Sequence, residues 1–287
     1  MEIIPLLLLV LVCVALLLGY PVAFTLAGVS LLFAFIGSIT GFFDPAIFKS
    51  IPIRIFGIMN NVTLLAVPLF VFMGTLLERS GVAGQMLSNM AKAFQNIRGG
   101  TSISIIIVGA LLAASTGIVG ATVVTMGLMS LPILIKQGYE KDFSAGLVAS
   151  TGTLGQIIPP SIALVLLGDV MSNAYQRAQN NLGIFSQKTV TVGDLFIGAI
   201  VPGMIICTGY LLYTIYKNYQ NKNIVTGISA EKIGSLELIK TLALPVFLIL
   251  IVLGSIIIGV ATPTEAAGIG AFGAILITVI NKKFNWN

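Results

Sequence analysis

Three short stretches of this 287-residue chain gather neutral oxygen-bearing residues, glycine and proline inside otherwise apolar sequence. They are Asn60–Pro68 (NNVTLLAVP), Ser115–Thr122 (STGIVGAT) and Gly155–Ser161 (GQIIPPS). Hydroxyl, amide and backbone carbonyl oxygens are hard, uncharged ligands, which suit a hard monovalent cation and not a transition metal. The pattern predicts a site for a monovalent cation, built from backbone and neutral side chains.

Missing residue types narrow the chemistry further. The chain has no histidine, which is the commonest general base and metal ligand. Its two cysteines, Cys13 and Cys207, lie in separate apolar stretches, and these stretches hold no pair of aspartates. We therefore expect no catalytic residues, no organic cofactor, no transition-metal site and no enzymatic activity.

Membrane helices must position the polar stretches. Hydrophobic residues make up 57% of the chain and charged residues only 9%, whereas soluble domains carry about 25% charged residues. A membrane helix needs about 20 apolar residues, and six charge-free intervals reach that length. They are 3–43, 55–77, 99–135, 143–168, 195–216 and 241–264. The composition predicts an all-α, multi-pass integral membrane protein.

The net charge of +5 comes largely from lysines near the ends of these intervals. An excess of lysine and arginine marks the cytoplasmic segments next to membrane spans. We therefore attribute the positive charge to orientation in a lipid membrane and expect no nucleic-acid partner. Residues 79–98 and 217–240 would both be cytoplasmic. A simple count of crossings does not allow this, so at least one of the three segments between them must be broken or re-entrant.

Two intervals have lengths that do not fit one straight crossing. The apolar run Leu64–Leu77 is short, which predicts a re-entrant hairpin with its tip near Asn60–Pro68. The charge-free interval 99–135 is longer than one helix needs, and its middle holds Ser115–Thr122. We expect the helix to break there.

The third interruption is the double proline Pro159-Pro160. The two prolines remove two backbone donors and free two carbonyls. Non-helical backbone at membrane depth is tolerated only where protein or a cavity surrounds it. Small-residue clusters can also serve only close helix packing, and a single proline can serve only as a kink. Three such stretches in one chain favour a binding site.

The chain also contains one internal echo. Gly28 follows Pro21 by seven residues, and Gly270 follows Pro263 by the same spacing, each pair after an apolar helix. The echo predicts a second repeat that begins near residue 241.

Glu265 is the only carboxylate deep in an apolar region, and intramembrane carboxylates are candidates for function. However, Thr262, Pro263 and Glu265 have the spacing of a capping box with proline at the first helical position. We predict that Thr262 and Glu265 cap a helix.

Four segments resemble the large membrane subunit of tripartite ATP-independent periplasmic (TRAP) transporters. They are LLAVPLFVFMGTLLERSG (64–81), STGIVGATVVTMGLMSLPILIKQGY (115–139), GQIIPPSIALVLLG (155–168) and GVATPTEAAG (259–268). Their order and spacing match the family over about residues 5–285. The resemblance implies an elevator-type transporter of inverted repeats with a re-entrant hairpin and broken helices. This chain would hold the first repeat and the start of the second.

The resemblance also implies partners and site residues. A small four-helix membrane subunit and a periplasmic substrate-binding protein would work with this chain in the bacterial inner membrane. A Na⁺ gradient would drive import of an organic anion such as a carboxylate. The Na⁺ ligands carried over are Asn60, Asn61, Thr63, Ser115, Thr116, Gly117 and Thr122. The substrate path carried over is Gly155, Gln156, Pro159, Pro160 and Ser161.

The chain departs from the family pattern in two ways. Ile118 and Val119 stand where the family's SGSSxA motif has polar residues, and only the opening helix of the second half is present. The regions expected are N-terminal scaffold helices in 1–56, a transport-type region in 57–168, a polar loop in 169–194, a span and cytoplasmic arm in 195–240, and the start of the second repeat in 241–287.

Other functions would leave different traces. A channel subunit, or an unrelated secondary transporter with a broken-helix ion site, could share these motifs, but a channel would give uncoupled flux without a binding protein. A purely structural subunit would tolerate substitution of Ser115 or Asn61.

Overall fold

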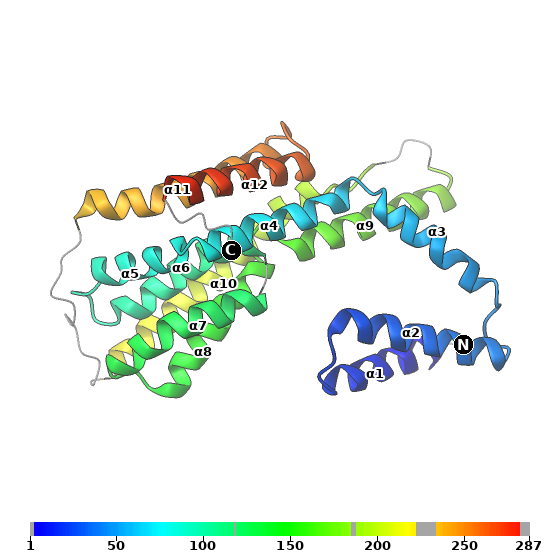
Figure 1. The fold of residues 1–287 in the computed structure, drawn as a ribbon, viewed down its shortest axis with the longest axis horizontal. Helices are drawn as coiled ribbons and strands as arrows, with labels where there is room; N and C mark the ends of the chain where they lie inside the picture. Colours follow the sequence, from blue (N-terminus) through cyan, green and yellow to red (C-terminus); the bar gives the residue numbers. More distant parts are fainter. Residues whose placement is uncertain (1–2, 118, 185–187, 222–233, 282–287) are drawn as a thin grey trace. The chain divides into compact units, whose positions relative to one another are not determined.

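The computed structural model describes residues 3–117, 119–184, 188–221 and 234–281, and its regular secondary structure in these ranges is helical throughout (Figure 1). The chain divides into two compact units, Met1–Asn61 and Val62–Asn287. The predicted all-α class is confirmed.

Unit 1 contains a pair of packed helices followed by a third. Helix α1 (Ile3–Leu17) packs against α2 (Val22–Ile39), and α3 (Ile47–Met59) follows. The chain turns between α1 and α2 at Gly19, whose φ of +81° lies in the left-handed region that glycine adopts easily.

Unit 2 is built around α6, whose residues Ile105, Ile106 and Val108 are fully buried. Helices α4, α5, α7, α8, α10 and α11 all pack against α6, and α12 packs along α4. The elements of unit 2 are η1 (Thr63–Leu65), α4 (Ala66–Arg79), α5 (Val82–Ala93), α6 (Gly100–Thr116), α7 (Val119–Lys136), α8 (Lys141–Thr153), η2 (Leu154–Gln156), α9 (Ile162–Asn181), α10 (Val192–Gln220), α11 (Ser235–Ile257) and α12 (Pro263–Ile280).

Small residues allow helices to approach α6 closely. A methyl group placed on Gly109 would lie only 2.0 Å from Cγ2 of Thr151 in α8, so the glycine is required for this contact. Close contact at small residues is how helices associate where the surroundings are as apolar as the helices themselves.

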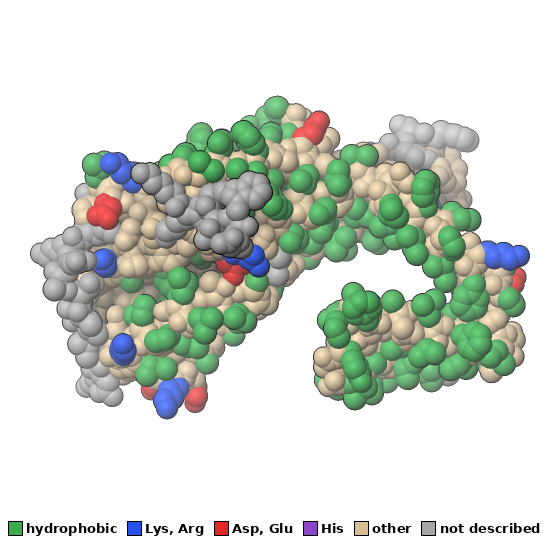
Figure 2. Space-filling view, in the orientation of Figure 1, with side chains coloured by type: hydrophobic (Ala, Val, Ile, Leu, Met, Phe, Trp, Pro, Cys, Tyr) green, Lys and Arg blue, Asp and Glu red, His purple; other side chains and the backbone are tan. Residues whose placement is uncertain are grey.

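Five helices within the described ranges are long and apolar enough to cross a membrane. They are Val22–Ile39, Val119–Lys136, Val192–Gln220, Leu236–Ile257 and Pro263–Ile280. Hydrophobic side chains cover much of the visible helix surface, and charged side chains gather in a few places (Figure 2). An apolar exterior of this kind fits a lipid surrounding.

One prediction about loops needs correction. The expected polar loop 169–194 is mostly helix, because α9 continues to Asn181 and only residues 182–191 connect it to α10. Polar residues there still form a helix, and the Asn173 side chain donates to the backbone oxygen of Asp169 one turn earlier. In the expected arm 217–240, α10 extends to Gln220 and α11 begins at Ser235, while 222–233 lie outside the described residues.

The echoed segments share a local plan. Helices α11 and α12 form a packed pair, as α1 and α2 do, and each pair turns through a left-handed glycine, Gly259 or Gly19, before a proline. The second repeat itself stays a prediction.

Candidate functional site

Helices α6 and α7 form an antiparallel hairpin that turns at Gly117. The arms pack on each other, and a methyl group on Gly109 in α6 would lie 3.0 Å from Cε of Met126 in α7. These two residues lie at nearly equal distances along the chain from Gly117, as antiparallel arms require. The predicted break is present, and it reverses the chain, because Gly117 has a left-handed φ of +61°.

The segments that lead into α6 and out of α7, which we call the feet of the hairpin, lie at the same end of unit 2. Before α6, Arg98 Nη2 donates to the Asn221 backbone oxygen at 2.6 Å. After α7, the Gly138 backbone oxygen accepts from Asn221 Nδ2 at 3.5 Å. The hairpin therefore enters and leaves beside the C-terminal end of α10. The interval 99–135 is thus broken between α6 and α7, in agreement with the prediction that one of the three segments between 79–98 and 217–240 is broken or re-entrant.

The stretch GQIIPPS interrupts the next helix, as predicted. Helix α8 ends at Thr153, and α9 begins at Ile162 after η2 and the non-helical residues that include the cis peptide Pro159-Pro160. Ser161 is fully buried; its Oγ donates to the Gln156 backbone oxygen at 2.9 Å and accepts from the Leu164 amide at 3.4 Å. The serine thus satisfies one freed carbonyl and caps α9.

This break lies alongside the middle of α10. Residue Tyr139, just before α8, is near the C-terminal end of α10, and Gly168 in α9 faces Val192 at its N-terminal end. Between them, a methyl group on Gly203 would lie 3.4 Å from Cγ1 of Ile158. Because α10 is about 43 Å long at 1.5 Å per residue, the break falls well inside the helix bundle.

The two interruptions meet directly. Gln156 Nε2 donates to the Gly117 backbone oxygen at 2.7 Å. A methyl group on Gly117 would lie 3.2 Å from Cγ1 of Ile162, and Gly117 itself is buried. The structure therefore brings Gly155–Ser161 into contact with the tip of the 115–122 hairpin.

Four helix ends converge at this junction, which we call the Gly117–Gln156 junction. Helices α6 and α8 end there, and α7 and α9 begin there. Helix C-terminal ends present carbonyl oxygens and N-terminal ends present N–H groups. The junction can therefore favour a cation on one side and an anion on the other, and its segments 114–123 and 154–162 contain no charged residue.

Several other predicted residues surround this junction. Thr122 is buried in the first turns of α7, and Gly155, Pro159 and Pro160 are buried in the break. Ser115 and Thr116 occupy the last turn of α6, but their side chains, like all of Ile118, lie outside the described part of the structure.

The remaining predicted ion ligands lie elsewhere in the described structure. Thr63 lines a cavity of about 430 Å³ whose walls come from α9, α10 and the α11–α12 turn, with no lining residue from 115–122 or 155–161. Asn60 follows the last residue of α3 in unit 1, and its Nδ2 donates to the Phe56 backbone oxygen in that helix at 2.8 Å. Asn61 follows it. Pro68 lies inside α4, so the break near Asn61 is short, and a hairpin at 60–68 stays a prediction.

The capping prediction for Glu265 is confirmed. Its Oε2 accepts from the Thr262 amide and hydroxyl, both at 2.8 Å, while Thr262 Oγ1 accepts from the Glu265 amide at 3.3 Å. The pair starts α12 at Pro263. Both side chains line the cavity near Thr63.

Sequence reasoning missed one polar contact between α4 and the hairpin. Glu78 lies in the last turn of α4, and its carboxylate accepts a hydrogen bond from the Thr125 hydroxyl in α7. No local spacing signals a pair so far apart in sequence. Within the described residues, no cluster of three His, Cys, Asp or Glu side chains could hold a metal ion.

Comparison with known proteins decides the family. The family profile "Tripartite ATP-independent periplasmic transporter, DctM component" matches residues 9–287. The chain belongs to this family. It is a TRAP large-subunit chain, and the relatives it matches are permease subunits and not enzymes. It is a multi-pass protein of the bacterial inner membrane.

Curated relatives match most of this chain but only about half of their own length. The C4-dicarboxylate TRAP transporter large permease protein DctM of Vibrio cholerae is 31% identical over 94% of this chain and 55% of its own length. The DctM protein of Rhodobacter capsulatus is 30% identical over 82% of this chain and 52% of its own length. The sialic acid permease SiaM of Vibrio cholerae is 26% identical over 91% and 56%. The chain spans about half the length of the relatives it matches.

Proposed function

We propose that this chain is the first half of the membrane permease of a Na⁺-coupled secondary transporter that imports an organic anion. A periplasmic binding protein delivers the anion, and a small four-helix membrane subunit completes the complex. The observation that carries the proposal is the Gly117–Gln156 junction, where a hairpin tip and a broken helix meet inside the bundle.

The junction supports coupled binding of two ions. Carbonyl oxygens at the ends of α6 and α8, with the hydroxyls of Ser115, Thr116 and Thr122, are suitable ligands for Na⁺. The N-terminal ends of α7 and α9 favour an anionic group. Because both kinds of helix end converge at one place, a bound cation stabilises the anion beside it. This shared location links the Na⁺ gradient to the uptake of the organic anion.

The names of relatives support the substrate class. C4-dicarboxylate, sialic acid, isethionate and ectoine permeases are among the matched proteins. We propose a carboxylate or a similar small organic acid for this transporter. Thr63, Asn60 and Asn61 are retained in the proposal as residues that complete the ion site or the substrate path.

The test is uptake by the full-length transporter reconstituted in proteoliposomes with its small subunit and binding protein. A panel of labelled C4-dicarboxylate, sialic acid and ectoine is offered under an inward Na⁺ gradient and, as a control, an equal K⁺ gradient. We expect uptake of one substrate class only with Na⁺ and binding protein present. Uptake that is indifferent to both would point to a channel and contradict the proposal.

Site variants sharpen the test. We expect Ser115→Ala and Thr122→Val to raise the Na⁺ concentration needed for half-maximal uptake by about tenfold each, since one charge-assisted contact contributes on the order of 1.5 kcal/mol or more. Thr25→Val is the matched control, because that hydroxyl donates only to the Pro21 oxygen of its own helix. An unchanged Na⁺ dependence in both site variants would remove these residues from the ion site.

A further inference from the structure

A second site lies at the end of unit 2 away from the Gly117–Gln156 junction. Helices α8 and α10 both pack on α6, and two adjoining hollows of about 240 and 520 Å³ lie between their facing side chains. Glu140, Phe143 and Lys217 line both hollows. They form one continuous groove, which we call the α8–α10 groove.

The groove is lined by residue types that are typical of the depth of lipid head groups. Tyr210, Tyr213, Tyr216 and Tyr219 recur every third residue along the end of α10, beside Lys217. Tyrosine collects at the membrane–water interface, and lysine near helix ends reaches toward the water there. The smaller hollow is lined by the last turn of α10 and the loop before α8.

The smaller hollow presents a buried acceptor without a partner. Asn218 is only 3% exposed; its Nδ2 donates to Ser102 Oγ at 2.9 Å, but its Oδ1 has no hydrogen-bond partner among the described residues. Ser102 Oγ donates to the Gly99 oxygen and accepts from the Tyr139 hydroxyl, so it has no proton left for Asn218. This fixes the amide with its oxygen unsatisfied.

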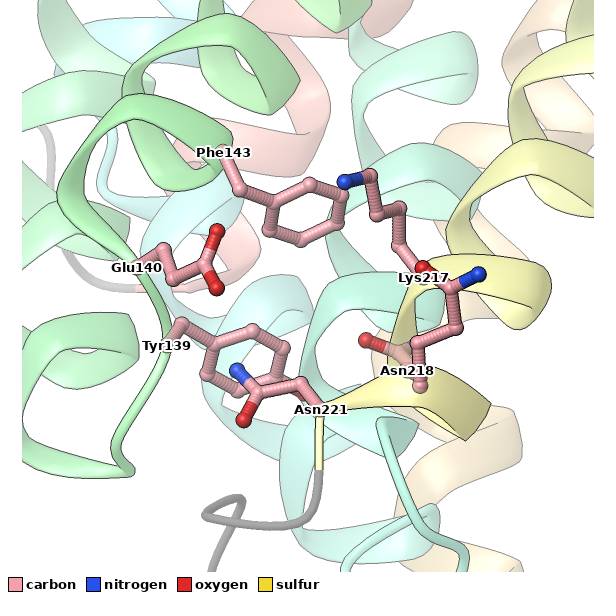
Figure 3. A pocket seen from close by; sticks show the side chains of 7 residues that line it. Tyr139, Glu140, Phe143, Lys217, Asn218 and Asn221 are labelled. Atoms are coloured by element: carbon pink, nitrogen blue, oxygen red, sulfur yellow. The ribbon is translucent and has the colours of Figure 1, made fainter.

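A buried oxygen in this position can accept a hydrogen bond from a donor outside the protein. Figure 3 shows the Asn218 side chain opposite Tyr139, with Glu140 and Lys217 on either side of the hollow. An unmet buried acceptor is costly, and a ligand with N–H groups would satisfy it. The oxygen therefore predicts a hydrogen-bond donor as part of the ligand.

Opposite charges face this hollow without pairing with each other. Neither the Glu140 carboxylate nor the Lys217 ammonium forms an ion pair within the described structure. The Tyr139 and Phe143 rings stack beside them, with centroids 6.0 Å apart and planes 9° apart. Aromatic faces attract cations. The hollow therefore offers a place for an ammonium group and, at Lys217, a separate place for a phosphate.

We propose that the α8–α10 groove binds an ethanolamine phospholipid. The ammonium donates to Asn218 Oδ1 and to Glu140, and the phosphate binds Lys217. An acyl chain follows the larger hollow along Leu147 and Tyr213. Charge complementarity within one zwitterionic head group, together with an apolar continuation along the helices, favours a lipid over a soluble zwitterion.

The test measures lipid binding by the full-length transporter in detergent, with native mass spectrometry and thermal stability as readouts. Phosphatidylethanolamine is compared with phosphatidylcholine, whose trimethylammonium group keeps the charge but has no N–H donor, and with phosphatidylglycerol. We expect phosphatidylethanolamine to bind at about tenfold lower concentration than either, in line with one lost charge-assisted hydrogen bond. Equal binding of the three lipids would overturn the proposal.

Variants locate the site. We expect Glu140→Gln to abolish the preference for phosphatidylethanolamine, Lys217→Gln to weaken the binding of all three lipids because each carries a phosphate, and the matched variant Lys136→Gln to change neither. Glu140 precedes α8 without a side-chain capping bond, so its substitution leaves the helix start intact. Full preference in Glu140→Gln, or unchanged affinity for all three lipids in Lys217→Gln, would overturn the site. Equal stabilisation by soluble phosphoethanolamine would overturn the lipid as its ligand.

Discussion

Two helical hairpins in this chain turn in the same way but in different surroundings. Helices α1 and α2 reverse at Gly19, and α6 and α7 reverse at Gly117, each glycine with a left-handed φ. Gly19 is exposed, with no atom within 4 Å of a methyl group placed on it. Gly117 is buried, crowded by Ile162, and its carbonyl accepts from Gln156.

The difference shows what burial adds to a turn. The exposed turn needs only a residue that tolerates a positive φ. The buried turn also needs space for its neighbour and a donor for its carbonyl, because an unpaired backbone oxygen is costly where water is excluded. Variants matched between the two hairpins can separate these three requirements.

Among the paired variants, Gly117→Ala and Gly19→Ala are expected to differ most in stability and in uptake. Both variants place an L residue in the left-handed region, which costs roughly 1–2 kcal/mol. Only Gly117→Ala also crowds Ile162, adding about 1–3 kcal/mol of overpacking. We expect Gly117→Ala to abolish uptake and lower the melting temperature of the full-length transporter markedly, and Gly19→Ala to keep most uptake.

Thermal unfolding of purified protein, followed by size-exclusion chromatography, measures this difference. Equal loss of stability in both variants would mean that crowding at Gly117 contributes nothing.

The second comparison concerns contacts along the arms. Gly109→Ala would place a methyl group 2.0 Å from Cγ2 of Thr151, whereas Gly28→Ala in α2 meets nothing within 4 Å. We expect Gly109→Ala to lose about 1–3 kcal/mol of stability. Gly28→Ala should gain about 0.5–1 kcal/mol, because alanine favours a helix interior over glycine.

A second substitution tests the cause of the loss at Gly109. Thr151→Ser removes the clashing methyl group but keeps the hydroxyl that donates to the Leu147 oxygen at 2.7 Å. The double variant Gly109→Ala/Thr151→Ser should recover most of the melting temperature. Failure to recover would show that the clash lies elsewhere, for example at Met126.

The third comparison removes an amide donor from each region. Gln156→Ala leaves the buried Gly117 carbonyl without its donor, with an expected cost of about 1–3 kcal/mol. Asn60→Ala removes an exposed donor to Phe56, and exposed substitutions usually stay within about 0.5 kcal/mol. Melting temperatures of the two variants, measured in the same detergent, should rank in that order. The reverse ranking would contradict the importance assigned to the junction.

The smallest effect concerns pH at the feet of the α6–α7 hairpin. Burial raises the pKa of Tyr139 above its usual value, although its hydrogen bond to Ser102 acts in the opposite direction. A raised folded-state pKa stabilises the fold below the unfolded value of about 10, and this contribution is lost as pH rises through the folded value. Tyr139→Phe should cost about 1 kcal/mol at pH 7 and remove this alkaline dependence.

Tyr20→Phe is the control, because Tyr20 is 66% exposed beside the turn of the α1–α2 hairpin. Melting curves at pH 7 and at about pH 10.5 give the comparison. An unchanged alkaline loss in Tyr139→Phe would assign that loss to another group.

Much of this fold follows from sequence, and the exceptions have physical causes. Apolar length located the spans, the double proline located the break before α9, and Thr262 with Glu265 located the start of α12. The break within 99–135 could be predicted, but its reversal of the chain could not, because Gly117 can adopt either backbone handedness and only its neighbours select one. The polar half of α9 was missed because a helix with a polar surface has the composition of a loop.

Contacts between distant segments were the least predictable. The hydrogen bond from Gln156 to Gly117 and that from Thr125 to Glu78 join helices whose order in the chain does not reveal their packing. Neutral side chains such as Asn218 carry no charge pattern that would indicate burial. Their importance emerges only when the feet of the hairpin and the end of α10 are seen together.

The hairpin also constrains the order of biogenesis. Gln156, the donor to the Gly117 carbonyl, lies 39 residues downstream. When the ribosome has completed α6 and α7, the partner of the hairpin tip has not yet been synthesised. The carbonyl at the tip therefore gains this donor only after α8 and the following break have been synthesised. The junction can form only when both interruptions are present, so the hairpin tip depends on a segment that the ribosome makes later.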